Sequence, residues 1–317
     1  MRIVLIGQAP FGARTLESLL DAGEEVIAVY TPLGKPGAKP DPLKEVARAK
    51  GIRNVEPKTY KDEQVFEEFA RLRPDLVVLA FVTGIVPGRY FRAAGKGAIC
   101  YHPSILPRHR GASAINWALI MGDKQTGLTI FWPDDGIDTG PILLQKEVAI
   151  GPQDTAGSLY FNSLFPMGVE AIVESVKLIR EGKAPRIAQD DSKATYEPPC
   201  NDPVAGLDWD SAGQRIYDLI RGCDPQPGAY AELHGEKVRF YGAGFVQGKI
   251  GGDIDVAPGT VTGLDLKGLR IAVAGGELLV AKVRTASAGK IDAAAWAADA
   301  SVKPGDRFGK FTNINNT

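Results

Sequence analysis

The chain has few cysteines and histidines, no long apolar run and no excess of charge. Its 317 residues include three cysteines and three histidines, and the formal net charge is −1. Cys100, Cys200 and Cys223 are far apart and odd in number, which rules out a disulfide framework and favours a reducing compartment. No Cys or His cluster has metal-ligand spacing, so we expect no metal site. The near-neutral charge gives no general attraction to nucleic acid or to an anionic membrane.

The first residues of the sequence are expected to form a strand and not a membrane span. Residues 1–7 form a short apolar run closed by Gly7, which is too short to span a membrane and has no small-residue cleavage site. We expect the first strand of a cytoplasmic protein here, with no membrane partner. Hydrophobic residues make up 44% of the chain and charged residues 24%. These globular values allow a sizeable core in one large or two ordinary domains.

Apolar runs and helical patterns alternate through the first part of the chain. Strands are expected at residues 3–7, 25–30, 75–81, 97–102, 126–132 and, at a sheet edge, 142–148. Helices are expected at residues 11–23, 42–51, 63–72, 112–121 and 155–182. This order predicts an α/β, Rossmann-like fold with a mostly parallel sheet and helices on both faces.

The composition changes after Ile187. Residues 189–203 are polar and contain three prolines, which is typical of a linker. A helix is expected at 211–221, followed by five short strand-like runs separated by glycines, at 230–233, 237–241, 259–262, 269–274 and 277–283. This pattern predicts a small, OB-like β-barrel. We therefore expect a first domain at 1–188, a linker at 189–203, a barrel domain at 204–309 and a disordered tail at 310–317.

Two polar side chains stand where neighbouring strands are expected to end. His102 closes one strand and is followed by Pro103, which cannot continue a strand ladder. Asp138 lies in the turn Asp134–Gly140 after the next strand. Open α/β sheets place their chemistry at such strand ends, and an imidazole beside a carboxylate can stabilise an oxyanion and move a proton. A structural histidine and an Asx-turn or solvated loop are the alternatives.

Three neighbouring features also have simpler interpretations. Cys100 shares a sheet face with His102, so the pair could make a thiolate nucleophile, but a small apolar strand cysteine is the preferred interpretation. Residues 7–12 lack the G-x-G-x-x-G spacing, so we expect a tight strand-to-helix turn and no dinucleotide-binding loop. Arg108 and Arg110 precede a helix start and either bind a substrate carboxylate or phosphate or form a solvated turn.

The motif His102-Pro103-Ser104-x-Leu106-Pro107-x-x-Arg110-Gly111, followed by Asp138-Thr139-Gly140, resembles the formyltransferases that use 10-formyltetrahydrofolate. The resemblance extends through residues 209–230 to about Arg307. Within that family the chain looks most similar to the N-terminal hydrolase domain of 10-formyltetrahydrofolate dehydrogenase. Methionyl-tRNA formyltransferase is also similar, but it has an Asn where this chain has Cys100, a position that the hydrolase domain likewise fills with another residue.

The resemblance implies a folate-dependent enzyme whose catalytic domain is the first one. It implies that His102 and Asp138 are catalytic, that 10-formyltetrahydrofolate is the substrate and tetrahydrofolate the product, and that no metal takes part. One wall of the folate site would be Gly84, Ile85 and Val86. The opposite wall would comprise Ser104, Ile105, Leu106 and Pro107 together with Asp135, Gly136, Ile137 and Asp138. Phe81, Cys100 and Arg110 would shape the pocket.

The formyl acceptor stays open at this point, as does the question whether the chain is free-standing or a domain of a longer protein. Water, an amine and a carrier thiol are candidates. From Pro203 onward, 13 Lys and Arg face 13 Asp and Glu, which weakens the tRNA alternative because a tRNA-gripping domain is usually basic. A sugar-nucleotide amine is a further alternative acceptor, and a folate- or nucleotide-binding protein without catalysis is another class. The missing glycine fingerprint argues against a Rossmann oxidoreductase.

Overall fold

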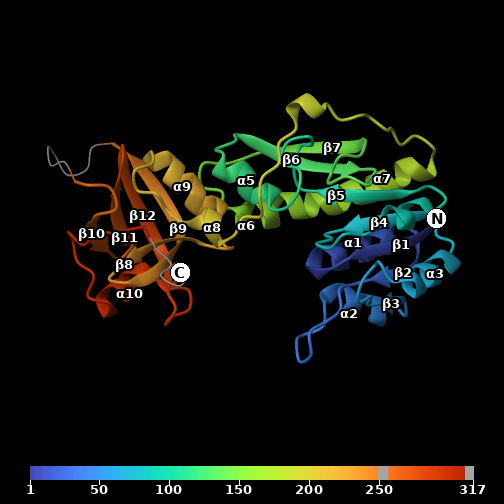
Figure 1. The fold of residues 1–317 in the computed structure, drawn as a ribbon, viewed down its shortest axis with the longest axis horizontal. Helices are drawn as coiled ribbons and strands as arrows, with labels where there is room; N and C mark the ends of the chain where they lie inside the picture. The colour runs from blue at the N-terminus through green and yellow to red at the C-terminus, as the bar shows by residue number, and fades with distance from the viewer. Residues whose placement is uncertain (249–255, 311–317) are drawn as a thin grey trace. The chain divides into compact units, whose positions relative to one another are not determined.

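The computed structural model describes residues 1–248 and 256–310 (Figure 1). The chain forms two compact units, one made of residues 1–111, 126–148 and 161–196, the other of 112–125, 149–160 and the chain from Glu197 onward. The domain boundaries at residues 188 and 204 stay predictions. Of the expected tail at 310–317, only Lys310 lies within the described residues.

A seven-stranded sheet forms the centre of the first unit. Its strands are β1 (Arg2–Gly7), β2 (Glu25–Tyr30), β3 (Arg53–Val55), β4 (Leu76–Ala80), β5 (Ala98–His102), β6 (Gln125–Phe131) and β7 (Ile142–Ala149). They lie in the order β3-β2-β1-β4-β5-β6-β7. All pairs from β3 to β5 are parallel, and β5 pairs antiparallel with β6. The mostly parallel sheet and the edge position of β7 are therefore confirmed, whereas the three-residue β3 was not predicted.

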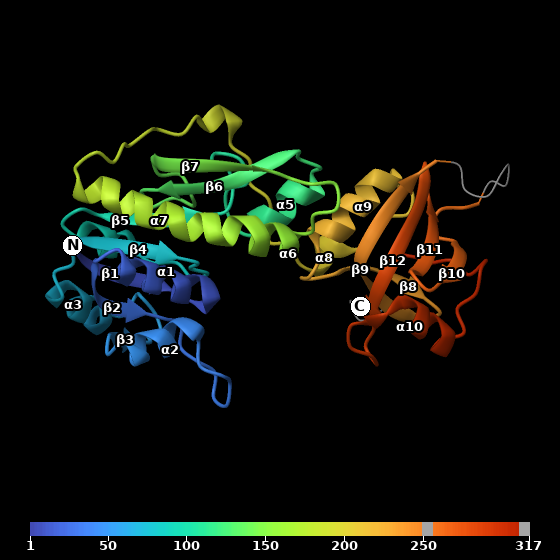
Figure 2. The ribbon, with the colours of Figure 1, turned by 180° about the vertical axis from the view of Figure 1, so that it is seen from behind.

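Helices cover both faces of this sheet because its strands bury alternate side chains on opposite sides. Ile3 and Leu5 pack in one cluster with α1 (Ala9–Asp21), α2 (Pro42–Ala49) and α7 (Phe165–Arg180). Figure 2 shows α7 running across that face. Val4 and Ile6 belong to a second cluster with α3 (Glu63–Arg71) and α4 (Gly88–Arg92). Each such fully buried aliphatic side chain contributes about 1.5–3 kcal/mol of transfer free energy.

The single long helix expected at 155–182 is interrupted. The structure has α6 (Ala156–Leu159), a π-helical turn (Tyr160–Leu164) and then α7. Pro166 sits in the first turn of α7. Because proline has no N–H and its ring clashes with the preceding turn, it is compatible with a helix start and not with a helix interior. No helix in the described ranges is both long enough and apolar enough to cross a bilayer.

The second unit is built on a six-stranded antiparallel sheet. Its strands are β8 (Ala229–Leu233), β9 (Glu236–Gln247), β10 (Val261–Asp265), β11 (Gly268–Val273), β12 (Gly276–Arg284) and β13 (Ile291–Asp292). The main path is β10-β11-β12-β9-β8, with β13 beside β12. The unit's helices are α5 (Ala114–Ile120), α6, α8 (Asp202–Ala205), α9 (Gly213–Gly222) and α10 (Ala293–Asp299). Of these elements, α8, α10 and β13 were not predicted.

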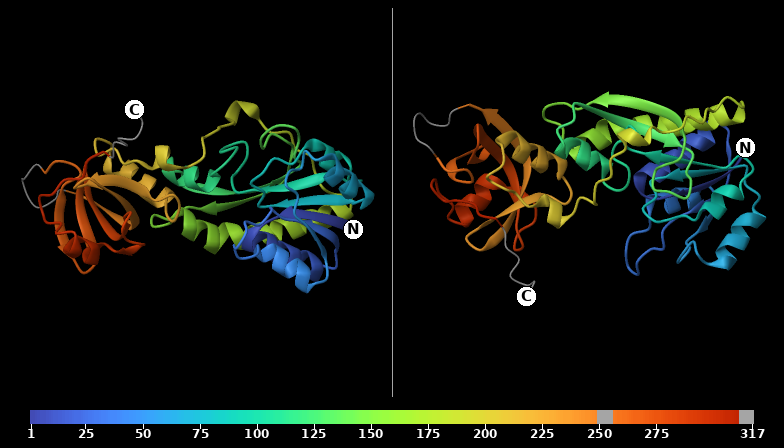
Figure 3. Two further views of the ribbon diagram at one scale, coloured as in Figure 1. Left: turned by 60° about the horizontal axis from the view of Figure 1, so that its bottom comes forward. Right: turned by 45° about the horizontal axis from the view of Figure 1, so that its top comes forward.

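A short C-terminal segment connects the two edges of this second sheet. Gly309 exchanges backbone hydrogen bonds with Glu232 of β8, at 2.9 and 3.0 Å. Asp306 accepts a 2.8 Å bond from the N–H of Val261 in β10. Residues 306–309 thus lie between the first and last strands of the path, and Figure 3 shows the strands curving around their core. This arrangement is consistent with the predicted small barrel, because both edge strands of the path have backbone partners in the C-terminal segment.

Candidate active site

His102 and Asp138 meet at the end of β5. His102 is the last residue of β5, and Asp138 lies in the turn between β6 and β7. The His102 Nδ1 atom is 3.4 Å from Asp138 Oδ2, and the two side chains are 7% and 18% exposed. The pair therefore forms a largely enclosed contact that keeps some access to solvent. The sequence prediction that these two strand ends meet agrees with this geometry.

The hydrogen bond made by Nε2 determines which ring nitrogen of His102 carries a proton. Nε2 lies 2.8 Å from the backbone carbonyl oxygen of His109. Because a carbonyl oxygen only accepts, Nε2 must carry a proton in this arrangement. Nδ1 then faces the Asp138 carboxylate either as a protonated donor in the imidazolium form or as an unprotonated acceptor. The site is thus arranged so that a proton gained or lost by the ring is exchanged at Nδ1.

Asp138 is held in an unusual backbone conformation. Its φ is +54°, in the left-handed region that most residues with a side chain avoid. The backbone N–H of Gly111 donates a 2.7 Å hydrogen bond to Asp138 Oδ2. The preceding turn is organised by Asp134, whose Oδ1 accepts from the Gly136 N–H at 3.0 Å and from the Thr139 hydroxyl at 2.6 Å. The Asx-turn interpretation of this loop is therefore confirmed at Asp134, while the Asp138 carboxylate is directed to His102.

The loop after His102 is anchored to the neighbouring strands. Thr129 of β6 donates from its hydroxyl to the Ser104 carbonyl at 2.7 Å and accepts from the Leu106 N–H at 3.1 Å. Gln145 of β7 donates to the Leu106 carbonyl at 2.9 Å. Ser104 and Leu106 are buried, whereas Ile105 and Pro107 are half-buried. Within the predicted folate wall, Ser104 and Leu106 thus hold the loop in place and leave little side-chain surface for a ligand.

Arg110 is neither a solvated residue nor open to a substrate anion. It is only 3% exposed, and its guanidinium donates to Gln189 Oε1 at 2.8 and 3.1 Å, to Asp191 at 2.6 Å and to the Tyr196 hydroxyl at 2.7 Å. These partners occupy the planar donor fork that would otherwise bind a carboxylate or phosphate. Arg110 therefore fixes the end of the loop and does not offer its charge to a ligand.

Residues 189–196, which the sequence presents as the start of a linker, are part of the site's framework. Besides binding Arg110, Gln189 donates from Nε2 to the carbonyls of Asp138 at 2.8 Å and Gly140 at 2.7 Å. Thr195 accepts from the His109 N–H through its hydroxyl at 2.8 Å. A 3₁₀ turn at Asp191–Lys193 lies between them. These contacts were missed because the segment's polar, proline-containing composition carries no sign of which distant residues it binds.

Cys100 lies near the pair without forming a nucleophile with it. Burial, together with the negative charge of Asp138, raises the pKa of the Cys100 thiol. Its Sγ lies 3.7 Å from the Tyr101 carbonyl oxygen, as a weak donor would. A thiolate is disfavoured in this environment. The apolar strand interpretation of Cys100 is therefore favoured over the nucleophile.

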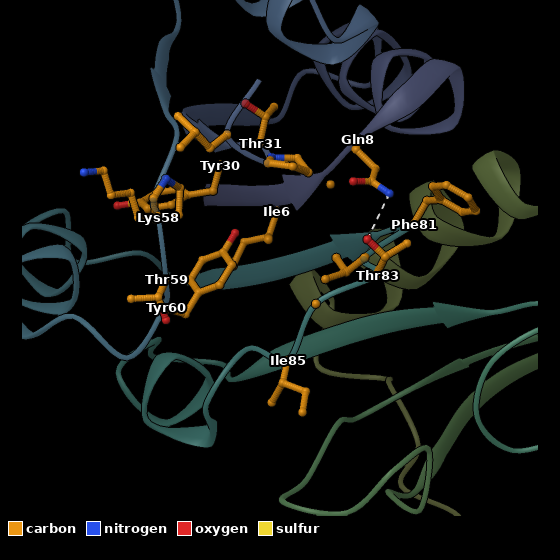
Figure 4. A pocket seen from close by; sticks show the side chains of 16 residues that line it. Ile6, Gln8, Tyr30, Thr31, Lys58, Thr59, Tyr60, Phe81, Thr83 and Ile85 are labelled. Atoms are coloured by element: carbon orange, nitrogen blue, oxygen red, sulfur yellow. Dashed lines mark hydrogen bonds between the residues drawn. The ribbon is translucent and has the colours of Figure 1, made fainter. Parts of the chain in front are cut away.

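A pocket of about 320 Å³ opens at the carboxyl ends of β1, β2 and β4 (Figure 4). Its wall comes from residues 6–8, 30–33, 57–60 and 81–85. Gln8 Nε2 donates to the Thr83 hydroxyl at 3.2 Å across it. It lies where the strand order changes direction between β1 and β4, the position at which open α/β sheets bind ligands.

The structure divides the predicted folate residues between this pocket and the neighbourhood of the His/Asp pair. Phe81, Gly84 and Ile85 line the pocket, and Ile85 is 88% exposed, whereas Val86 is buried. The turn residue Asp135 is exposed and pairs with Arg92 at 3.3 Å, and Ile137 is exposed as well. Gly136 is also exposed. Across residues 1–248 and 256–310, no three His, Cys, Asp or Glu side chains come together as a metal site.

Comparisons with known proteins agree on one family. The formyl transferase model matches residues 1–176, and the formyl transferase C-terminal domain model matches residues 204–301. The mitochondrial 10-formyltetrahydrofolate dehydrogenase of Mus musculus is 43% identical over 275 residues, which cover 83% of this chain and 30% of that protein. The methionyl-tRNA formyltransferase of Geotalea uraniireducens (strain Rf4) is 33% identical over 315 residues, covering 98% of each chain.

A solved structure shares the fold. HypX from Aquifex aeolicus, in complex with tetrahydrofolic acid, aligns with a TM-score of 0.69 at 17% identity, covering 99% of this chain and 51% of that one. At this identity the likeness concerns the fold alone. The chain spans about 30% of the mouse dehydrogenase and nearly the whole length of the tRNA enzyme. By the two domain matches and the full-length relative, the chain belongs to the formyl transferase family.

Proposed function

We propose that this chain is an enzyme that removes the formyl group of 10-formyltetrahydrofolate and releases tetrahydrofolate, with water as the preferred acceptor. The observation that carries the proposal is the 3.4 Å contact between His102 Nδ1 and Asp138 Oδ2, with the other ring nitrogen held by a carbonyl. The 43% identity to a 10-formyltetrahydrofolate dehydrogenase supports the choice of donor.

The chemistry assigns one role to each member of the pair. Asp138 accepts a proton from the attacking water as its oxygen bonds to the formyl carbon, and the carbonyl oxygen becomes an oxyanion. His102, as an imidazolium beside Asp138, stabilises the negative charge on that oxygen. Collapse of the tetrahedral intermediate breaks the carbon–N10 bond, N10 takes the proton that Asp138 accepted from water, and the formic acid formed leaves as formate after losing its remaining proton to solvent. Each such role is worth roughly a hundred- to ten-thousand-fold in rate.

The folate ring is assigned to the surface formed by Gly84, Ile85 and Phe81. Gly84 has open space where a side chain would be, and the exposed Ile85 and Phe81 offer apolar surface beside it. A flat heteroaromatic ring packs well against such backbone and apolar side chains. Val86, the next residue, is buried in the hydrophobic cluster that includes Tyr90 and Phe91, and so anchors this loop.

Transfer to methionyl-tRNA is the second candidate, because the tRNA enzyme of Geotalea uraniireducens matches this chain over its whole length. The equal numbers of cationic and anionic residues from Pro203 onward weaken it, because backbone phosphates are normally met by a basic surface. A sugar-nucleotide amine and a carrier thiol are further possible acceptors.

The test follows the formyl carbon. The protein is incubated with isotopically labelled 10-formyltetrahydrofolate alone, and then with methionyl-tRNA, an amino-sugar nucleotide or a carrier thiol. We expect tetrahydrofolate and labelled formate in equal amounts without any acceptor. If the label were recovered on one acceptor, and no formate formed when that acceptor was left out, the protein would be a transferase and not a hydrolase. Donor that stays intact in every mixture would overturn the proposal.

A further inference from the structure

Two cysteines that are distant in the chain come together in the second unit. The Sγ atoms of Cys200 and Cys223 lie 3.7 Å apart, although the residues are 23 positions apart in sequence. Cys223 is fully buried, whereas Cys200 is half-buried. A disulfide has an S–S distance of about 2.05 Å, so a small shift of the two side chains would bring the sulfur atoms to bonding distance. The pair takes no part in the His102–Asp138 site.

The backbone holds both cysteines in this position. Cys223 follows the last residue of α9, and its N–H donates to the Leu219 carbonyl at 3.0 Å, while its own carbonyl accepts from the Gly228 N–H at 2.9 Å. The N–H of Cys200 donates to the Ser113 hydroxyl at 3.1 Å. These backbone hydrogen bonds hold both residues where the two thiols are in contact.

The two thiols differ in their surroundings. A hydrogen bond from Cys223 lowers the pKa of Cys200, which favours its thiolate. The hydrogen bond to Cys200, together with burial, raises the pKa of Cys223. The accessible sulfur is therefore the one that attacks, and the buried sulfur is placed to resolve the product. This division of roles is typical of thiol pairs that exchange with disulfides.

We propose that Cys200 and Cys223 form a reversible disulfide with a small-molecule disulfide such as glutathione disulfide as the oxidant. The Cys200 thiolate attacks one sulfur of the oxidant, and one glutathione thiolate leaves. Cys223 loses its proton and attacks Cys200 Sγ, which breaks the mixed disulfide and releases the second glutathione. Two protein thiols are oxidised, one glutathione disulfide is reduced to two glutathiones, and both thiol protons end on glutathione or solvent.

The disulfide would lock the segment before α8 to the end of α9. Cross-linking residues 23 positions apart removes conformations from the unfolded chain, so the oxidised protein should be the more stable form. A cross-link of this span is expected to raise the melting temperature by roughly 5 °C in a chain of this size.

The test uses the full chain equilibrated in glutathione buffers of increasing oxidised fraction. After acid quenching and alkylation, we expect a proteolytic peptide pair that joins Cys200 to Cys223 and is lighter by two hydrogens, with Cys100 still alkylated. Reduction should reverse it. Cys223→Ser should accumulate a stable glutathione adduct on Cys200, because the resolving sulfur is missing. Cys200→Ser should show neither the adduct nor the melting-temperature increase.

Two outcomes would overturn the proposal. One is an absence of the joined peptide at every ratio while Cys200 remains free. The other is glutathione adducts appearing on Cys100 as readily as on Cys200, since that would show non-specific oxidation. Cys200 is only half-buried, so Cys200→Ser is a mild change, and circular dichroism of each variant separates loss of the pair from loss of the fold.

Discussion

Gln189 donates its side-chain amide to the backbone carbonyl of Asp138, 51 positions earlier in the chain, at 2.8 Å. The carbonyl oxygen of the same side chain accepts from the buried guanidinium of Arg110 at 2.8 Å. One residue therefore ties the turn that carries the carboxylate to the loop that follows the imidazole. The relative placement of His102 and Asp138 depends on a residue that touches neither of their side-chain functional groups.

Replacing Gln189 by Leu should loosen the site. The change removes one of the three side-chain partners of the Arg110 guanidinium and the amide donor to two backbone carbonyls, which costs about 2 kcal/mol of unfolding free energy. We expect a lower kcat at an almost unchanged KM for the folate donor, because the substrate contacts remain. Steady-state kinetics and urea denaturation measure the two effects.

Gln64→Leu, on the exposed surface of α3, is the matched control. It should change neither kcat nor the unfolding free energy beyond about 0.5 kcal/mol. A Gln189→Leu enzyme with full kcat would show that this residue only stabilises the fold.

Asp138→Asn should remove most of the activity without unfolding the chain. Asparagine still accepts from the Gly111 N–H and tolerates the positive φ, but it neither takes a proton nor stabilises an imidazolium. We expect formate release to fall by about 10²–10⁴-fold. The rate of tetrahydrofolate formation and the near-ultraviolet dichroism are the measurements.

His102→Ala should show a loss of similar size, whereas His234→Asn serves as control. His234 is 55% exposed, 3.6 Å from Asp306 in the second unit, and its positive φ suits asparagine. Near-normal rates for either Asp138→Asn or His102→Ala would remove the pair from the mechanism.

Gly84→Val tests the folate surface. Nothing lies within 4 Å of the position a Cβ would take at Gly84, so the free protein should keep its stability. The added side chain would occupy the surface assigned to the ring. We therefore expect the Kd for tetrahydrofolate, measured by calorimetry, to rise at least tenfold, or about 1.4 kcal/mol.

Gly95→Val also adds a side chain in open space and should leave tetrahydrofolate binding unchanged. Equal affinities for Gly84→Val and the parent chain would place the ring elsewhere.

The three thiols should react with iodoacetamide in a defined order. The lowered pKa of Cys200 gives it more thiolate at a given pH, and the raised pKa values of Cys100 and Cys223 give them less. Peptide mapping after short exposure at mildly alkaline pH should find Cys200 labelled first. Modification of Cys100 at an equal rate would contradict the environment described for it.

Local patterns were sufficient for the elements that surround the site. The apolar runs predicted β1, β2, β4, β5, β6 and β7 to within about one or two residues, because a strand buried on both faces is continuously hydrophobic. The three-residue β3, the short α4 and the break before Pro166 were missed. β3 and α4 are too short for a hydrophobic period to emerge, and the break before Pro166 was missed although a proline does not fit a helix interior.

The contacts that complete the site could not be predicted from local patterns. The sequence describes residues 189–203 as a polar linker, yet Gln189 and Thr195 bind the loops that carry Asp138 and His109. The same reasoning found the cysteines too far apart for a disulfide framework, yet Cys200 and Cys223 lie in contact. Hydrogen bonds between residues that are distant in the chain produce no periodic pattern in the sequence, so they could not be predicted from it.

The sequence by itself determined the alternation of strands and helices, the strand ends that carry His102 and Asp138, and the family motif around them. Each of these depends on residues within a few positions of one another, where hydrophobic period and turn chemistry act. Only the tertiary structure decided that Nδ1 is the ring nitrogen facing the carboxylate, that Arg110 is already occupied, and that two distant thiols meet. These contacts join segments that are far apart in the chain. They form, and stabilise the site, only when the sheet and its loops have packed together.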